Sequence, residues 1–127
     1  MYICNMEQYE FIILSKLPTL NEYIAIERGN KFYAAKMKAE FTDLCAKYFL
    51  VCPKMPKQLY DVDIYWTVEN DKTDADNVFF GVKFILDGAK RSGRLADDNR
   101  KNIRHIHNYI ETAKSYEVRV IFKPVKQ

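Results

Sequence analysis

Aspartates in two stretches of the chain have the types and spacing expected of a divalent-metal site. Asp74 and Asp76 belong to a D-x-D-N segment that ends at Asn77. Asp98 lies twenty-two residues after Asp76 and is the second member of an adjacent acidic pair. Mg²⁺ prefers hard oxygen ligands, usually one or two carboxylates together with water and substrate phosphate. Two such ions can activate an attacking water and stabilise a leaving oxygen, so these residues predict a metal site that acts on phosphates.

The same residue types also have a structural interpretation. Asp and Asn at the start of a helix cap free backbone amides and favour the positive end of the helix dipole. Taken alone, D-x-D-N is more often a helix cap, and Asp97-Asp98 is more often a solvated turn. In an extended segment, however, Asp74 and Asp76 would point to the same side, and Asp98 could fold back beside them. We expect this combination of acids to bind metal.

Basic residues surround the second acidic pair. The stretch 90–104 sets six of them against two acids, a local excess of four positive charges: Lys90, Arg91, Arg94, Arg100, Lys101 and Arg104. Such a run is often just a solvated loop. Beside acids that bind metal, it is typical of a surface that binds the phosphates of a nucleic acid.

The elements that must position these acids can be predicted from the periodicity of apolar residues. Apolar and polar side chains alternate over residues 60–68, which is the period of a strand with one buried face. A helix is predicted over residues 78–89, where apolar positions recur on one side. The first acidic segment therefore lies where the chain passes from this strand to this helix.

The rest of the chain completes a small α+β domain. An amphipathic helix is predicted over residues 31–50, because apolar residues recur there mostly at three- and four-residue steps. Further strands are predicted over residues 9–17, 103–110 and 116–123, with loops at 18–22 and 90–102. The order predicts one domain over residues 1–127, with two main helices packed on a mixed or antiparallel sheet.

Length and composition agree with a single folded domain in a reducing compartment. A chain of 127 residues, 48% of them hydrophobic, is long enough to bury one core. The net charge of +3 is too small to indicate nucleic-acid binding by itself. Three cysteines without a C-x-x-C spacing argue against a disulfide framework, and no apolar run approaches the roughly twenty residues of a membrane span. We expect a cytoplasmic protein that does not contact membranes.

Several segments occur together in a characteristic order. They are D-A-D-N at 74–77, K-F-I-L-D-G at 83–88, Gly93, the Asp97-Asp98 pair and, more loosely, P-T-L-N-E-Y at 18–23. This combination resembles the RusA-type Holliday junction resolvases, a family of crossover junction endodeoxyribonucleases. The likeness in the order of elements covers residues 9–123, whereas the specific residues are mostly confined to 74–98.

The resemblance implies a homodimeric, RusA-like endonuclease that uses Mg²⁺, or Mn²⁺ as a substitute, to cut four-way DNA junctions symmetrically in recombination and repair. Such an enzyme would act in the cytoplasm of a bacterial or phage-infected cell. By position, Asp74, Asp76 and Asp98 would be the metal ligands. Lys83 would contact the scissile phosphate. Supporting roles would fall on Asn21, Asn77, Asp87 and Asp97.

Two other functions remain open. The chain could be a module that binds branched nucleic acid through its basic loop without cutting it, or a nuclease of the same fold that acts on flaps or single strands. His105 and His107 would share one face of a strand, as metal-binding pairs sometimes do. Polar strand positions are the commoner explanation of such histidines, and we predict that role for them.

Overall fold

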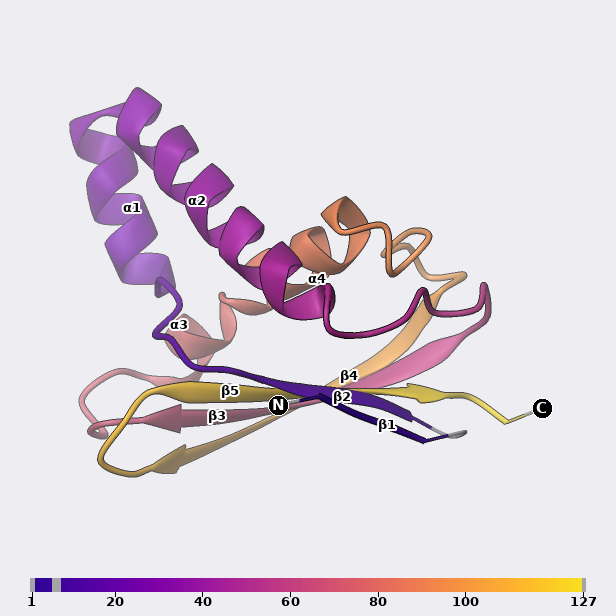
Figure 1. The fold of residues 1–127 in the computed structure, drawn as a ribbon. Coiled ribbons are helices and arrows are strands. Elements are labelled where there is room, and N and C mark those ends of the chain that lie inside the picture. Colours follow the sequence, from indigo (N-terminus) through magenta and orange to yellow (C-terminus); the bar gives the residue numbers. More distant parts are fainter. Residues whose placement is uncertain (1, 6–7, 127) are drawn as a thin grey trace.

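A computed structural model of the chain describes residues 2–5 and 8–126. These described residues form one α+β domain in which a mixed sheet is covered by a layer of helices (Figure 1). The strands are β1 (Tyr2–Asn5), β2 (Gln8–Ile13), β3 (Tyr60–Val68), β4 (Ile103–Thr112) and β5 (Glu117–Pro124). The helices are α1 (Leu20–Gly29), α2 (Lys31–Phe49), α3 (Ala75–Phe79) and α4 (Val82–Arg91). The prediction of a small α+β domain with a mixed sheet is therefore confirmed.

The sheet has the strand order β1-β2-β5-β3-β4. β3 and β4 run parallel, whereas the other neighbouring strands are antiparallel. β4 and β5 follow each other in the chain through a short connection, which suggests that they pair directly. In the sheet, however, β3 lies between them. This order puts β3, the strand that leads into the first acidic segment, between two partners.

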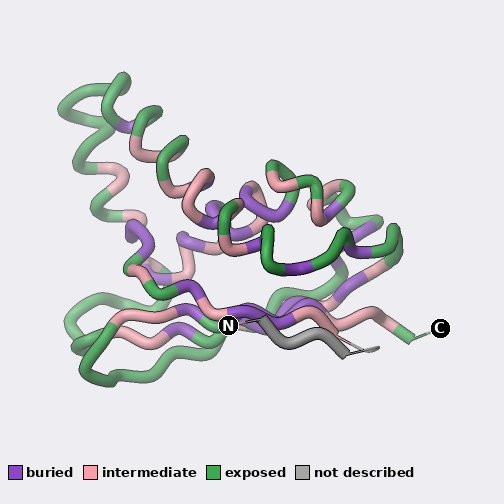
Figure 2. The backbone as a smooth tube through the Cα atoms, viewed as in Figure 1, coloured by how far each residue is buried: buried purple, intermediate pink, exposed green. Residues whose placement is uncertain are grey.

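The hydrophobic core lies between the sheet and the helices. β3 has the bounds that the alternating pattern predicted, and its inward side chains include Val62 and Trp66, both buried. Phe49 of α2 packs against Phe122 of β5 with 5.7 Å between ring centroids, which joins the helix layer to the sheet. Figure 2 shows the buried positions concentrated between the two layers, while the far ends of α1 and α2 are largely exposed.

The helix layer contains one helix that the sequence did not predict. Residues 18–22 were expected to be a loop, but α1 begins at Leu20. Thr19 and Glu22 form a capping box: the Glu22 N–H donates to Thr19 Oγ1 at 3.3 Å, and the Thr19 N–H donates to Glu22 Oε1 at 3.0 Å. These two bonds satisfy amides that would otherwise lack partners at the start of the helix. Among the described residues, no helix has the length and apolar character needed to cross a bilayer.

The helix predicted over residues 78–89 is in fact two helices, because the chain turns between α3 and α4. Gly81 lies at this break, against the indole of Trp66: a Cβ added there would be 2.7 Å from Trp66 Cη2. Gly88 lets α4 approach α2 equally closely, since its added Cβ would be 2.6 Å from Cys45 Cβ. Close approach at these two glycines sets the position of α4 above the sheet.

Candidate metal and nucleic-acid site

Asp74 lies at the start of α3, where the chain has crossed from β3 through a bent segment. Its backbone is extended, and its carbonyl oxygen accepts hydrogen bonds from the N–H groups of Asn77 and Val78 at 3.1 and 3.2 Å. Within the described chain, however, the exposed Asp74 carboxylate makes no hydrogen bond that caps the helix. Capping therefore does not occupy this carboxylate, which remains available to a ligand.

Asp76 lies in the first turn of α3, so the expected extended arrangement of the two acids is wrong. The helix starts at Ala75, three residues before the predicted start. Asp74 is therefore extended while Asp76 is helical, and the two residues do not belong to one extended segment. One carboxylate oxygen of Asp76 accepts the N–H of Asn77 at 3.0 Å. Among the described residues, its other carboxylate oxygen has no hydrogen-bond partner, and the side chain is exposed.

Asn77 contributes an oxygen atom that has no partner. Its Oδ1 atom is buried and accepts no hydrogen bond in the described part of the molecule. An unsatisfied buried acceptor costs about 1–3 kcal/mol, and such atoms commonly mark a place for water or an ion. Asn77 lines the same pocket as Asp74, with a volume of about 390 Å³. The pocket is thus lined by a free carboxylate and by an asparagine whose buried amide oxygen has no partner in the described part of the molecule.

Two lysines face the same pocket and were not predicted to take part in the site. Lys16 comes from the segment after β2, and Lys72 lies two residues before Asp74. The proximity of Lys72 could have been read from the sequence, whereas that of Lys16 depends on the fold. Asn21, predicted as a supporting residue, also lines this pocket. These residues suit a phosphate bound beside a hard cation, because lysines neutralise phosphate charge while carboxylate and amide oxygens bind the cation.

Asp98 does not join these oxygen ligands. It lies in the loop after α4, and Figure 1 shows α4 running between the start of α3 and that loop. In residues 2–5 and 8–126, no group of three or more His, Cys, Asp or Glu side chains is arranged to hold a metal ion. The predicted set of three carboxylates is therefore not gathered here: of Asp74, Asp76 and Asp98, Asp74 alone lines the pocket, where it suits a cation that keeps water and phosphate ligands.

Asp97 organises the loop in which Asp98 lies. Its Oδ1 atom accepts the N–H of Asp98 at 2.8 Å and lies 3.5 Å from Lys90 Nζ, while its Oδ2 atom accepts from Asn99 Nδ2 at 3.2 Å. The backbone hydrogen bond from Asp98, aided by the charge of Lys90, lowers the pKa of Asp97. Asp97 therefore helps to hold the local conformation of the loop, and Asp98 is half-buried beside it.

Lys83 and Asp87 form a loose pair on one side of α4. Their Nζ and Oδ2 atoms are 3.9 Å apart, as expected of residues four positions apart on a helix. Lys83 is exposed and is not part of the pocket that Asp74 lines. Asp87 is therefore a partner of Lys83 on the surface of α4.

Two of the six basic residues serve the fold. Arg94 donates from Nε to the Cys52 carbonyl at 2.7 Å and from Nη2 to the Leu50 carbonyl at 3.3 Å, which fixes the chain just after α2. Arg104 binds the Asp61 carboxylate with two hydrogen bonds, at 3.1 and 2.7 Å. Their guanidinium groups already have partners, so these two residues are poor candidates for direct phosphate contacts.

The other four basic residues are accessible. Lys90 pairs with Asp97 and Arg91 with Asp43, at 3.5 and 2.8 Å, yet both line an open groove of about 490 Å³ between α2 and α4. Lys38 of α2 lines the same groove and was not predicted. Arg100 and Lys101 are exposed, and within the described chain neither side chain pairs with an acid. The accessible positive charge therefore lies along the groove and at the tip of the loop.

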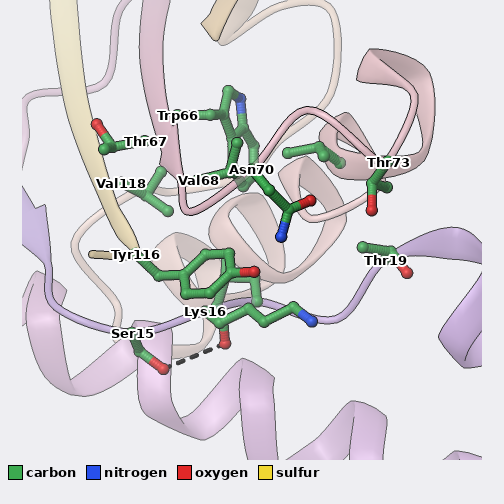
Figure 3. Close-up of a pocket in the computed structure, with 12 residues that line it drawn as sticks. Ser15, Lys16, Thr19, Trp66, Thr67, Val68, Asn70, Thr73, Tyr116 and Val118 are labelled. Carbon is green, nitrogen blue, oxygen red and sulfur yellow. Dashed lines mark hydrogen bonds between the residues drawn. The ribbon is translucent and has the colours of Figure 1, made fainter. Parts of the chain in front are cut away.

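A narrower, partly aromatic pocket adjoins the acidic segment (Figure 3). Trp66 and Tyr116 line it, together with Lys16 and Thr73, which also line the Asp74 pocket. The Lys16 ammonium lies 5.4 Å from the centroid of the Tyr116 ring. This recess of about 30 Å³ lies beside the charged pocket and shares two of its lining residues with it.

Comparison with known proteins adds no assignment to this geometry. No protein-family model matches the chain, and a search of curated proteins finds no match. The similarity to the RusA-type resolvases therefore rests on the motifs and their order alone, and it stays a prediction.

Proposed function

We propose that the protein is a metal-dependent endonuclease of the RusA type that cuts four-way DNA junctions by phosphodiester hydrolysis. The observation that carries the proposal is the pocket at the start of α3, where the free Asp74 carboxylate and the unsatisfied Asn77 Oδ1 occur with two lysines. Oxygen donors beside cationic side chains are what a phosphodiester and its divalent cation require.

The residues of the pocket divide the work by their chemistry. Asp74, which lines the pocket, and Asp76, which follows it in the first turn of α3 but is not a lining residue, would hold Mg²⁺ or Mn²⁺ through carboxylate oxygens. The bound cation supplies Lewis acidity and a water of lowered pKa. Lys16 and Lys72 would neutralise and orient the phosphodiester, because both residues line the pocket with Asp74. Lys16 also pairs with Glu22 of the same pocket, at 3.5 Å.

The surrounding surface binds the arms of the junction. Arg100 and Lys101 offer unpaired positive charge among the described residues, and the groove between α2 and α4 adds Lys38, Lys90 and Arg91. Lys83, on the exposed side of α4, would contact a phosphate outside the pocket. A homodimer with two equivalent sites suits two symmetric nicks, since a four-way junction has two-fold symmetry.

A second function is favoured by the position of Asp98. Because Asp98 belongs to the loop after α4 and no three acids of the described residues are arranged to hold a metal ion, the chain could bind branched nucleic acid without cutting it. Binding would then use the groove and the loop, and the pocket at α3 would hold a phosphate without hydrolysing it.

The test compares labelled substrates of equal length and sequence: a four-way junction, a flap and a single strand. Wild-type protein is incubated with each in Mg²⁺, in Mn²⁺ and in EDTA, together with Asp76→Asn. Asp71→Asn, an exposed acid in the preceding bend, serves as the matched control. Paired nicks on the junction alone, lost with EDTA and in Asp76→Asn, support the proposal. Tight junction binding without nicks establishes the second function, and equal cutting of flaps and junctions overturns the junction substrate.

A further inference from the structure

Two histidines of β4 lie opposite two aspartates of β3 on the sheet face away from the helices. The parallel register pairs Asp61 with His105 and Asp63 with His107. Alternate residues of a strand share a face, so all four side chains lie on the side opposite the core residues of β3. Figure 1 shows the helices gathered on the other side of the sheet. This cluster is therefore separate from the pocket at α3.

Each carboxylate is held in place by a basic residue. Asp63 has a side chain only 6% exposed and forms an ion pair with Lys123. Asp61 accepts two hydrogen bonds from Arg104, and these lower the pKa of Asp61. Both basic partners belong to the same sheet, on β5 and β4. Asp63 is thus positioned to accept a hydrogen bond from the His107 ring, while Asp61 accepts the backbone N–H of His105 at 3.2 Å and lies near its ring.

The aspartates contact one particular nitrogen of each imidazole ring. His107 Nδ1 lies 3.0 Å from Asp63 Oδ1, and His105 Nδ1 lies 3.6 Å from Asp61 Oδ1. A carboxylate at this position favours the tautomer with the proton on Nδ1, which leaves the lone pair on Nε2. This is the arrangement found where histidines bind metal ions: one ring nitrogen donates to a carboxylate, and the other is the ligand.

The two rings are also near enough to share one ion. Their centroids are 5.8 Å apart, whereas two imidazoles bound at about 2.0–2.1 Å to one ion have centroids roughly 4.5–5.3 Å apart. Rotation of the side chains closes this difference. The histidine side chains are 57% and 52% exposed, so an ion reaches them from solvent.

We propose that His105 and His107 bind a transition-metal ion of the Zn²⁺ class through their Nε2 atoms, with Asp61 and Asp63 orienting the rings. Imidazole nitrogens select Zn²⁺, Ni²⁺ or Cu²⁺ over Mg²⁺, so this site and the oxygen-rich pocket at α3 take different metals. Two protein ligands leave positions for water or for an exchangeable ligand. Burial raises the pKa of the Cys45 thiol to about 12, which makes that thiol a weak competitor for the ion.

The test is a calorimetric titration of the folded protein with Zn²⁺ in the presence of excess Mg²⁺. One equivalent is expected to bind, and binding is expected to be lost in His105→Gln and in His107→Gln. Tyr109→Phe, on the same strand and face, is the matched control and should bind as the wild type does. Zn²⁺ binding that survives in either histidine variant overturns the site, as does a wild-type protein that binds no Zn²⁺.

The orienting role of the carboxylates has its own readout. Asp63→Asn is expected to weaken Zn²⁺ binding about 10–100-fold, the usual effect of removing a carboxylate partner of a ligating histidine. If burial of Asp63 makes that variant unstable, Asp61→Asn tests the longer contact with His105, at a more exposed position. Unchanged Zn²⁺ affinity in a folded aspartate variant overturns the orienting role.

Discussion

Replacing Gly88 with alanine tests the close packing of α4 on α2, which sets the groove and the path from α3 to the basic loop. The added methyl group would lie 2.6 Å from Cys45 Cβ, 2.9 Å from the Ala46 nitrogen and 3.0 Å from the Cys45 carbonyl carbon. Two of these three atoms belong to the backbone of α2, which cannot rotate away. The helices must therefore move apart.

The size of the effect follows from these distances. Carbon atoms pack at about 3.5–4.0 Å, so the helices would have to separate by roughly 1 Å at this contact. Overpacking a core costs about 1–3 kcal/mol, and a backbone clash belongs at the upper end. Alanine returns about 1 kcal/mol through its better helix propensity. The net loss in free energy of unfolding is about 2 kcal/mol, which lowers the Tm of a domain of this size by roughly 8 °C.

The assay is thermal unfolding followed by circular dichroism, with Gly29→Ala as the matched control. Gly29 also lies in a helix, but a Cβ added there meets nothing within 4 Å in the described chain. We expect Gly29→Ala to leave the Tm unchanged or slightly raised. If Gly88→Ala unfolds at or above the wild-type Tm, α2 and α4 do not pack as described.

Three further predictions concern basic residues and the acid that one of them binds. Arg94→Ala should lower the free energy of unfolding in urea by about 1–2 kcal/mol, because two backbone carbonyls lose a charged donor; unchanged stability would contradict this. Arg104 holds the pKa of Asp61 below its unfolded value, so this stabilisation is present above about pH 4 and is lost as the pH falls further. In Asp61→Asn, the free energy of unfolding should fall less steeply as the pH is lowered below about 4. A fall as steep as that of the wild type would refute the pairing of Asp61 with Arg104. Arg100→Ala with Lys101→Ala should reduce the slope of log K against log salt for junction binding by about two, and an unchanged slope removes both from the interface.

Local periodicity was sufficient to predict the elements around which the domain is built. The alternation of apolar residues predicted β3 with its observed bounds, Tyr60–Val68. The helix expected over residues 31–50 is α2, Lys31–Phe49. Both elements bury one regular face, so their pattern in sequence reflects directly how they pack.

Other features depend on contacts between distant residues. The break between α3 and α4 lies where Gly81 meets Trp66, and the helical pattern of residues 78–89 does not predict it. The position of β3 between β4 and β5 is likewise determined by strand pairing between residues far apart in the sequence. By contrast, α1 had a readable signal, because Thr19 and Glu22 have the spacing of a capping box.

The candidate site was predictable in part. Asp74, Asn77 and Asn21 line one pocket, although they come from segments more than fifty residues apart in the chain. Lys16 could not be predicted, because it reaches the pocket from the segment after β2. The structural role of Arg94 was also invisible, since its partners are backbone carbonyls, which carry no signal in the sequence.

The single-turnover rate of junction cleavage by Asp74→Asn, measured in Mn²⁺ beside wild type and Asp71→Asn, tests the proposed nuclease most directly. Loss of a ligand to the cation should cost several kcal/mol in the transition state, so cleavage by Asp74→Asn should fall at least about 100-fold. Asp71→Asn should cleave as the wild type does, and both variants should still bind the junction. Cleavage by Asp74→Asn at the wild-type rate would contradict the assignment of the pocket at α3 as the active site.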